Sequence, residues 1–294
     1  NDDETWEYHL SKLKETNVIN FGVGNYGIDQ ALLRMKREYQ KNKTQTVILG
    51  VVPDTISRIV SVWKHYYEYG NTFGFKPRFI VKNNQLQLIQ NPIDHESKFY
   101  KYGNYLGQIR ENDFFYRNKF KREILHFPYC ITILKNFRRN YGIINWVRKI
   151  QSLKNSKKDF SEIEWNPTKI IMKINLEWRV KLYQDKQITL LLKKIIEEFF
   201  LFSKQNQFKP VLVILPQKDD VNFIKKNFHF YENFLEELSN LEELQIIDTT
   251  KDFLQVKNLD SLYSDKNEYG GHYSVDGNQK IASIINDELT TDSL

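Results

Sequence analysis

Short apolar runs alternate with stretches of helical periodicity at the beginning of this 294-residue chain. Residues 18–24 (VINFGVG) and 46–52 (TVILGVV) have the composition of buried strands, whereas apolar side chains recur at helical spacing over 5–16 and 27–41. Parallel strands need a crossover connection, which is usually a helix, so this order is typical of a parallel sheet. The pattern predicts an α/β fold.

The last third of the chain repeats the same order. Residues 210–216 (PVLVILP) and 244–248 (LQIID) read as buried strands, and helical periods cover 187–205, 219–239 and 274–288. We therefore predict that these two strands and the two near the beginning lie as parallel neighbours in one sheet. Their carboxyl ends would then face a ligand crevice.

The middle of the chain interrupts this pattern. A β-hairpin with Asn83-Asn84 as its turn is followed by aromatic and basic residues with few clear periods. We predict an α/β domain made of residues 1–70 and 171–294, and an insertion over 71–170. Two interpretations of the insertion stay open, namely a cap packed by its Phe and Tyr side chains and a lid that shapes a substrate pocket.

Composition excludes several classes of protein. The chain has no apolar run of 18 residues, so no membrane span is expected, and its single cysteine, Cys130, excludes an intrachain disulfide and a cysteine-based zinc site. No metal or organic cofactor is expected. The net charge of +6 comes mainly from lysine, which favours a solvated basic surface over nucleic-acid binding. A basic binder that uses the stretch from Arg138 to Lys149 remains the least favoured alternative.

Two loops carry candidate chemistry. His272 follows two glycines just before the last helical period, where a histidine is placed to act as a general base. Gly22, Gly24 and Gly27 follow the first apolar run and would expose backbone N–H groups to an oxyanion or a phosphate. A dinucleotide site is disfavoured, because the acid after the next strand, Asp54, lies too far along the chain.

Four segments together resemble the SGNH (GDSL-type) hydrolases: ETWEYHL, VINFGVGNYGIDQALLRM, TVILGVVPDTISR and GGHYSVDGNQKIASII. The resemblance spans both α/β halves and omits the insertion. It implies a flavodoxin-like three-layer α/β/α fold with a parallel sheet. It also implies serine ester chemistry on an acyl ester, on a small molecule, a glycan or a lipid.

The resemblance assigns roles to individual residues. His272 matches the base of the family, and the backbone N–H of Gly24 or Asn25 matches an oxyanion donor. The family's second oxyanion donor is an asparagine side chain in the block that here ends in Pro53-Asp54, where Pro53 has no donor. Asp54 stands with Gly24 and Asn25 as a candidate oxyanion or substrate-binding residue. From the position of ligand sites at strand ends and from the resemblance, we expect His272 close to the Gly24–Asn25 loop with Asp54 nearby.

The acid of the family is also replaced, because Tyr269 stands three residues before the histidine. Glu268 and Asp265 are close enough in sequence to substitute for it. A dyad without an acid is the remaining possibility.

The nucleophile of the family has no counterpart in residues 1–294, which contain no Gly-Asp-Ser sequence. In the family this block lies shortly before the position of Asn1. The resemblance thus implies an ester hydrolase or acyltransferase whose serine lies upstream, and we expect the 294 residues alone to be inactive. The alternative is a non-catalytic SGNH-like domain that binds a glycan or a protein partner, which the Pro53 and Tyr269 departures favour.

Overall fold

The computed structural model describes residues 2–68, 73–155, 166–265 and 269–291. The chain divides into two compact units. An α/β unit comprises Asn1–Ile59, Phe79–Leu88 and Arg179–Leu294, and a mainly helical unit comprises Val60–Arg78 and Ile89–Trp178. The helical unit is thus longer at both ends than the predicted insertion over 71–170. Most of the hairpin belongs to the α/β unit.

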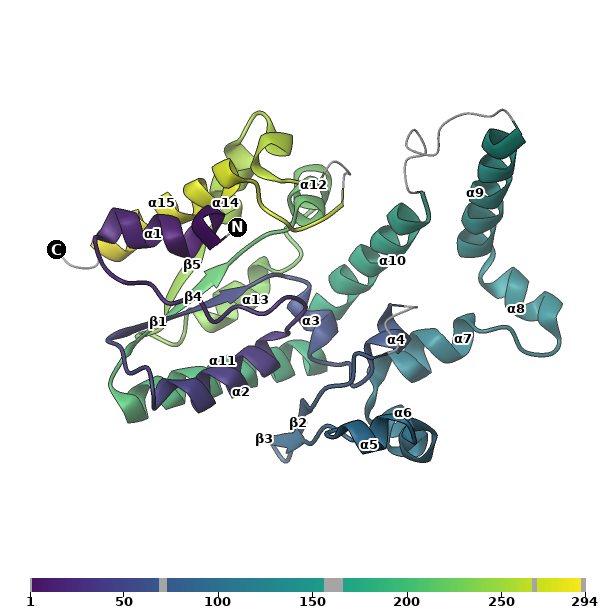
Figure 1. The fold of residues 1–294 in the computed structure, drawn as a ribbon, viewed down its shortest axis with the longest axis horizontal. Helices are drawn as coiled ribbons and strands as arrows, with labels where there is room; N and C mark the ends of the chain where they lie inside the picture. Colours follow the sequence, from purple (N-terminus) through teal and green to yellow (C-terminus); the bar gives the residue numbers. More distant parts are fainter. Residues whose placement is uncertain (1, 69–72, 156–165, 266–268, 292–294) are drawn as a thin grey trace. The chain divides into compact units, whose positions relative to one another are not determined.

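The α/β unit contains a three-stranded parallel sheet (Figure 1). Its order is β1 (Thr46–Val51), β4 (Lys209–Ile214) and β5 (Gln245–Asp248). In the register of the sheet, Gly50 lies opposite Val213 and Leu212 lies opposite Ile246. The central strand β4 is buried along most of its length, as expected for a strand covered on both faces. The parallel pairing predicted for these three segments is confirmed.

The strand predicted over residues 18–24 is wrong. This segment has no regular secondary structure, and Ile19, Phe21 and Val23 are exposed. The side chain of Asn20 accepts a hydrogen bond from the N–H of Gly22 at 2.7 Å, which turns the backbone locally and competes with strand pairing. Only Val18 packs against the core, so the apolar run does not indicate burial here.

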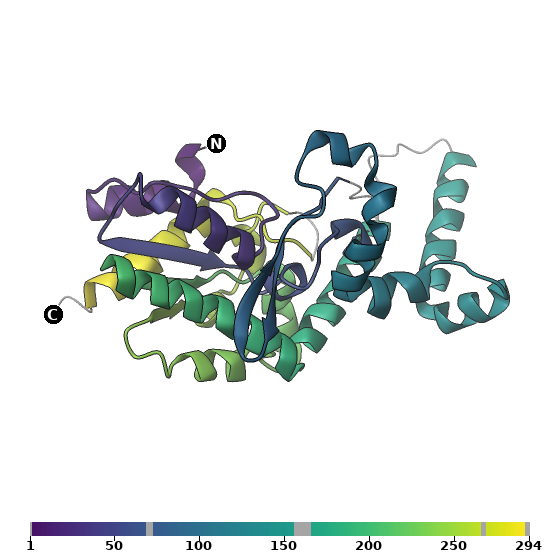
Figure 2. The same ribbon diagram turned by 90° about the horizontal axis from the view of Figure 1, so that it is seen from below.

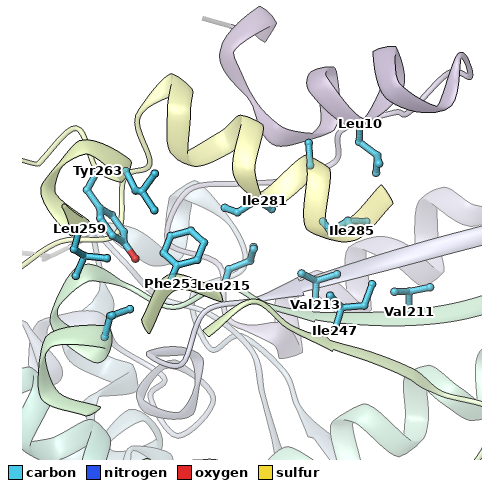
Figure 3. Close-up of a cluster of buried hydrophobic side chains, with 13 residues drawn as sticks. Leu10, Val211, Val213, Leu215, Ile247, Phe253, Leu259, Tyr263, Ile281 and Ile285 are labelled. Atoms are coloured by element: carbon cyan, nitrogen blue, oxygen red, sulfur yellow. The ribbon is translucent and has the colours of Figure 1, made fainter. Parts of the chain in front are cut away.

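Helices cover both faces of the sheet (Figure 1). On one face, α1, α14 and α15 enclose a buried cluster in which Leu10 and Ile285 meet Val211 and Val213 of β4 (Figure 3). On the other face, α2 and α11 lie side by side (Figures 1 and 2). Lys36 of α2 is paired there with Glu198 of α11. The bounds of these helices are α1 Trp6–Lys14, α2 Ile28–Tyr39, α11 Lys186–Asn206, α14 Thr250–Gln255 and α15 Val275–Thr291.

Shorter helices complete the α/β unit. They are η1 Asp2–Glu4, α3 Thr55–Arg58, α12 Lys218–Lys226, α13 Glu232–Leu238 and η5 Leu259–Leu262. The single helix predicted over 219–239 is therefore two helices, α12 and α13. The predicted hairpin is confirmed as β2 (Arg78–Lys82) and β3 (Gln85–Ile89). Its turn residues, Asn83 and Asn84, both have positive φ, as this turn requires.

The helical unit is organised around a buried carboxylate. One oxygen of Asp113 accepts hydrogen bonds from the N–H groups of Val62 at 2.7 Å and Trp63 at 3.0 Å. Trp63 stacks on Phe75, with ring centroids 5.0 Å apart, so this carboxylate also fixes part of an aromatic core. The helices of this unit are α4 Lys64–Tyr67, α5 Glu96–Phe99, η2 Tyr102–Tyr105, α6 Leu106–Asn112, η3 Tyr116–Phe120, α7 Lys121–Glu123, α8 Tyr129–Lys135, α9 Phe137–Asn155 and the first part of α10 Asn166–Tyr183.

A search of the described residues for a membrane-spanning helix found none with the necessary length and apolar character.

The cluster under α15 should carry a large share of the stability of the α/β unit. Ile281 is fully buried there, so Ile281→Ala should lower the free energy of unfolding by about 2–5 kcal/mol. Leu201→Ala is the matched control, because Leu201 is 53% exposed on α11 and its loss should change stability by about 0.5 kcal/mol or less. Urea denaturation of both variants measures this difference. Equal effects would show that the cluster is not the core.

Candidate active site

His272 and Asp265 form a close pair in the loop between η5 and α15. An antiparallel bridge joins Tyr263 to Tyr273, and Ser264 donates its N–H to the carbonyl oxygen of His272 at 2.9 Å. Just beyond this bridge, Nδ1 of His272 lies 3.1 Å from one oxygen of Asp265. The other oxygen accepts the backbone N–H of His272 at 2.9 Å. The carboxylate therefore holds both the ring and its backbone.

This geometry leaves the reactive nitrogen of the imidazole available. An ionised carboxylate can only accept a hydrogen bond, so Asp265 favours the tautomer of His272 in which Nδ1 carries the proton and Nε2 carries a lone pair. The side chain of His272 is 84% exposed, and that of Asp265 is 25% exposed. Within the described part of the chain, Nε2 of His272 makes no hydrogen bond. The pair can therefore accept a proton from a group brought to the surface of this loop.

The two acids predicted as partners of His272 have different outcomes. The structure places Asp265 against the imidazole. Glu268 lies outside the described residues. Asp265 stands seven residues before His272, and the bridge between Tyr263 and Tyr273 brings the two residues together.

The beginning of α12 holds the His272 loop. The backbone N–H of Lys218 donates to the carbonyl oxygen of Gly270 at 2.8 Å, and its Nζ lies 2.7 Å from Asp260 and 3.2 Å from the carbonyl oxygen of Asp265. Gly270 has φ +138°, and a Cβ there would collide with the carboxylate of Asp265. Because α12 follows β4 directly, these contacts place His272 at the carboxyl edge of the sheet.

A buried arginine connects the loops at this edge. Arg179 on α10 is 1% exposed. Its guanidinium lies 3.1 Å from Asp219 and 3.4 Å from Asp54, and it also pairs with Asp220. Asp219 in turn accepts the N–H of Gly270 at 3.3 Å. The segment after β1, the first turn of α12 and the His272 loop are therefore joined through one cation.

This arginine cluster was not predicted from the sequence. Asp219 and Asp220 follow a buried strand, as Asp54 does, so two acidic groups at one sheet edge are a signal for a buried counterion. No local pattern identifies Arg179 as that counterion. It lies 40 residues away from Asp219, on a different helix, and no motif around it indicates a buried charge.

Burial changes the protonation chemistry of the cluster. It raises the pKa of Asp220 to about 7, and the negative charge of Asp219 acts in the same direction, whereas Arg179 opposes both. Burial also raises the pKa of the neighbouring Tyr183 hydroxyl. The cluster is therefore poised to hold a proton near neutral pH.

Asp54, predicted at the oxyanion or substrate site, has a carboxylate that pairs with two arginines of the same chain. Its carboxylate lies 3.0 Å from Nε of Arg58 and 3.4 Å from Arg179, and its side chain is 8% exposed. Arg58 also donates to the carbonyl oxygen of Tyr26 at 2.9 Å. Asp54 thus helps to fix the glycine-containing loop.

Gly24 and Asn25, the predicted oxyanion donors, lie in that loop as an exposed turn. The turn is closed by the N–H of Tyr26, which donates to the carbonyl oxygen of Val23 at 3.2 Å, and Asn25 has φ 67°. The hydrogen bonds of His272 among the described residues go to Asp265 and Ser264, and none goes to this turn. The structure therefore joins the turn to the cluster through Arg58, but not directly to the imidazole.

A hollow of about 390 Å³ lies away from these loops. Lys209 and Pro210, at the amino end of β4, help to line it, and so does the ion pair of Lys204 with Glu243. It therefore lies at the opposite edge of the sheet from His272. No group of three or more His, Cys, Asp or Glu side chains suited to a metal ion occurs among the residues that the structure describes.

Comparison of the chain with protein families, with curated proteins and with solved structures found no match.

Replacing Arg179 should leave buried carboxylates without a counterion. Arg179→Met should lower the free energy of unfolding by about 3–5 kcal/mol, because buried Asp219 and Asp220 lose their counterion. The control is Arg37→Met, whose side chain is 69% exposed in its pair with Glu38 and should contribute about 0–1 kcal/mol. Urea unfolding at neutral pH compares the two. A small loss for Arg179→Met would contradict the role assigned to the cluster.

The raised pKa of Asp220 predicts a specific dependence on pH. Between the ordinary value of 3.8 and about 7, the folded state binds more protons than the unfolded state, so this group's contribution to stability falls as pH rises. The stability difference between wild type and Asp220→Asn should therefore shift against wild type from pH 5 to pH 7, on the order of 1–3 kcal/mol. Unfolding of both proteins at the two pH values measures it. A constant difference would mean that Asp220 ionises normally.

Proposed function

We propose that this chain belongs to a serine ester hydrolase or acyltransferase of the SGNH type, in which His272 is the general base and Asp265 its acidic partner. The observation that carries the proposal is the pair itself. An exposed imidazole is held at Nδ1 by a carboxylate and leaves Nε2 available, which is the arrangement that activates a serine in a catalytic triad.

The position of the pair also supports this proposal. In open α/β sheets, ligands bind outside the carboxyl ends of the strands, and the His272 loop is anchored there through α12. Helices on both faces of the parallel sheet fit a flavodoxin-like three-layer arrangement, which we propose as the finer fold class (Figure 1).

In the proposed mechanism, the nucleophile is a serine supplied from outside residues 1–294. Its oxygen attacks the acyl carbonyl carbon while its proton passes to Nε2 of His272. The backbone N–H of Gly24 or Asn25 stabilises the oxyanion. The imidazolium then gives the proton to the leaving alkoxide. Water, or an acceptor alcohol in an acyltransferase, attacks the acyl-enzyme in the second half-reaction.

The substrate class proposed is an acyl ester on a small molecule, a glycan or a lipid. The second candidate function is a non-catalytic SGNH-like domain that binds a glycan or a protein partner. Two observations favour it: Pro53 has no N–H to donate, and the neighbouring Asp54 carboxylate is committed to Arg58 and Arg179. Turnover separates the two candidates, because only the first needs His272 as a base.

The test compares the 294-residue chain with a form extended upstream to include the proposed serine. The extended form should hydrolyse p-nitrophenyl acetate, and the 294-residue chain should not exceed the buffer rate. In the extended form, His272→Ala should lower kcat by at least about 10³-fold, and Asp265→Asn should lower it by about 10²–10⁴-fold through loss of the productive tautomer. His126→Ala is the matched control, because His126 is also exposed but lies in the helical unit.

Three outcomes decide the proposal. Turnover by the 294-residue chain that survives His272→Ala would exclude His272 as the base. An extended form without turnover that binds an acylated sugar would favour the non-catalytic domain. An equal loss of activity in His126→Ala would show that the loss in His272→Ala results from a general effect on folding and not from removal of a base.

A further inference from the structure

The segment of residues 124–148, called here the α8–α9 segment, exposes a dense set of apolar side chains. It contains α8 and the first part of α9, which follow each other directly (Figures 1 and 2). Phe127 is 82% exposed, Leu134 69% and Leu125 62%. The other large apolar side chains exposed in this segment are Ile124, Tyr129, Ile131, Ile133, Phe137, Tyr141, Ile143, Ile144 and Val147. Apolar surface of this extent is rare on a soluble monomer and marks an interaction site.

The charges of the same segment are all positive. From Ile124 to Lys158 the sequence contains no Asp or Glu. The α8–α9 segment carries Lys135, Arg138, Arg139 and Arg148. Arg139 lies 3.7 Å from Glu123, just outside the segment, and the side chains of the other three are exposed. An anionic partner would complement this surface.

The type of cationic side chain indicates which class of anionic partner this surface would bind. The whole chain has 32 Lys and 11 Arg, whereas from Ile124 to the end of α9 at Asn155 it has three arginines and three lysines, so arginine is enriched in this region. A guanidinium binds phosphate through two parallel N–H groups, whereas an ammonium acts as a point charge. Phosphate groups beside an apolar phase, as at a bilayer surface, match both the arginines and the exposed aliphatic side chains.

Two other partners fit this surface less well. Single-stranded nucleic acid binds through aromatic stacking, and most of the exposed apolar side chains here are Ile, Leu or Val. A second copy of the chain would bring like-charged surfaces together in a symmetric interface, with no carboxylate in the segment to compensate.

We propose that the α8–α9 segment docks the protein on the surface of an anionic phospholipid bilayer. The apolar side chains enter the boundary between headgroups and acyl chains, and the arginines bind headgroup phosphates. The protein lies on the membrane in this proposal and does not span it. The proposal is independent of the ester chemistry proposed for the α/β unit.

The chain offers a natural reporter for this docking. Cys130 is its single cysteine, is exposed and lies in α8, so it can carry an environment-sensitive fluorophore such as NBD. The labelled protein should co-sediment with phosphatidylcholine vesicles that contain about 30% phosphatidylserine, with a blue shift of NBD emission, and not with pure phosphatidylcholine vesicles. Binding should weaken as salt rises.

Charge reversal tests whether this segment is responsible. Arg138→Glu/Arg148→Glu should weaken partitioning into the anionic vesicles by about tenfold or more. The matched control is Lys226→Glu/Lys257→Glu, which changes the net charge equally at exposed positions of the α/β unit and should keep most of the binding. Circular dichroism of both variants verifies that they are folded.

Several results would overturn the proposal. They are the absence of binding to anionic vesicles, equal binding to neutral ones, and equal losses in the two charge-reversal variants. Binding of a single-stranded RNA without vesicle binding would assign the surface to nucleic acid. Concentration-dependent dimerisation that buries Cys130 without vesicle binding would assign it to a second copy of the chain.

Discussion

The α/β unit depends on one buried cation at the carboxyl edge of its sheet. Arg179 meets three carboxylates, namely that of Asp54 just after β1 and those of Asp219 and Asp220 in the first turn of α12, which follows β4. Through Asp219 it also reaches the backbone of Gly270, and through Asp54 and Arg58 it reaches the turn at Tyr26. Loops that are far apart in sequence thus share one electrostatic centre. Breaking such a centre is costly, because it leaves charge buried without a partner.

The elements that were predicted correctly are those whose signal is local. The strands β1, β4 and β5 are continuous apolar runs with helical periods between them, and Asn83-Asn84 has the backbone preference that its turn requires. Residues 18–24 have an equally apolar composition, but a strand also needs a neighbouring strand edge. A side-chain hydrogen bond of Asn20 satisfies part of this backbone instead.

The candidate site shows the same division. His272 was identifiable from its glycine-rich surroundings and from the resemblance, and Asp265 was one of two acids close enough in sequence to reach it. The contact of Asp265 with the imidazole depends on the bridge from Tyr263 to Tyr273, which is a feature of tertiary structure, and Glu268 lies outside the described residues. Arg179 could not be identified from the sequence, because the partners of a buried ion pair are close in three dimensions and need no fixed separation along the chain. The predicted role of Asp54 depended on its position after a strand and on the family resemblance, and neither reveals the two arginines beside it.

The bridge between Tyr263 and Tyr273 has a consequence for how this site can vary. Asp265 and His272 lie on the two sides of one short loop, and their mutual geometry is set within that loop. The carboxylate of Asp265 and the imidazole of His272 therefore move together if the loop shifts, so the exposure of the ring can change while its hydrogen bond to the carboxylate is kept. The alignment of the imidazole with the carboxylate is thus a local property of the segment that the Tyr263–Tyr273 bridge closes.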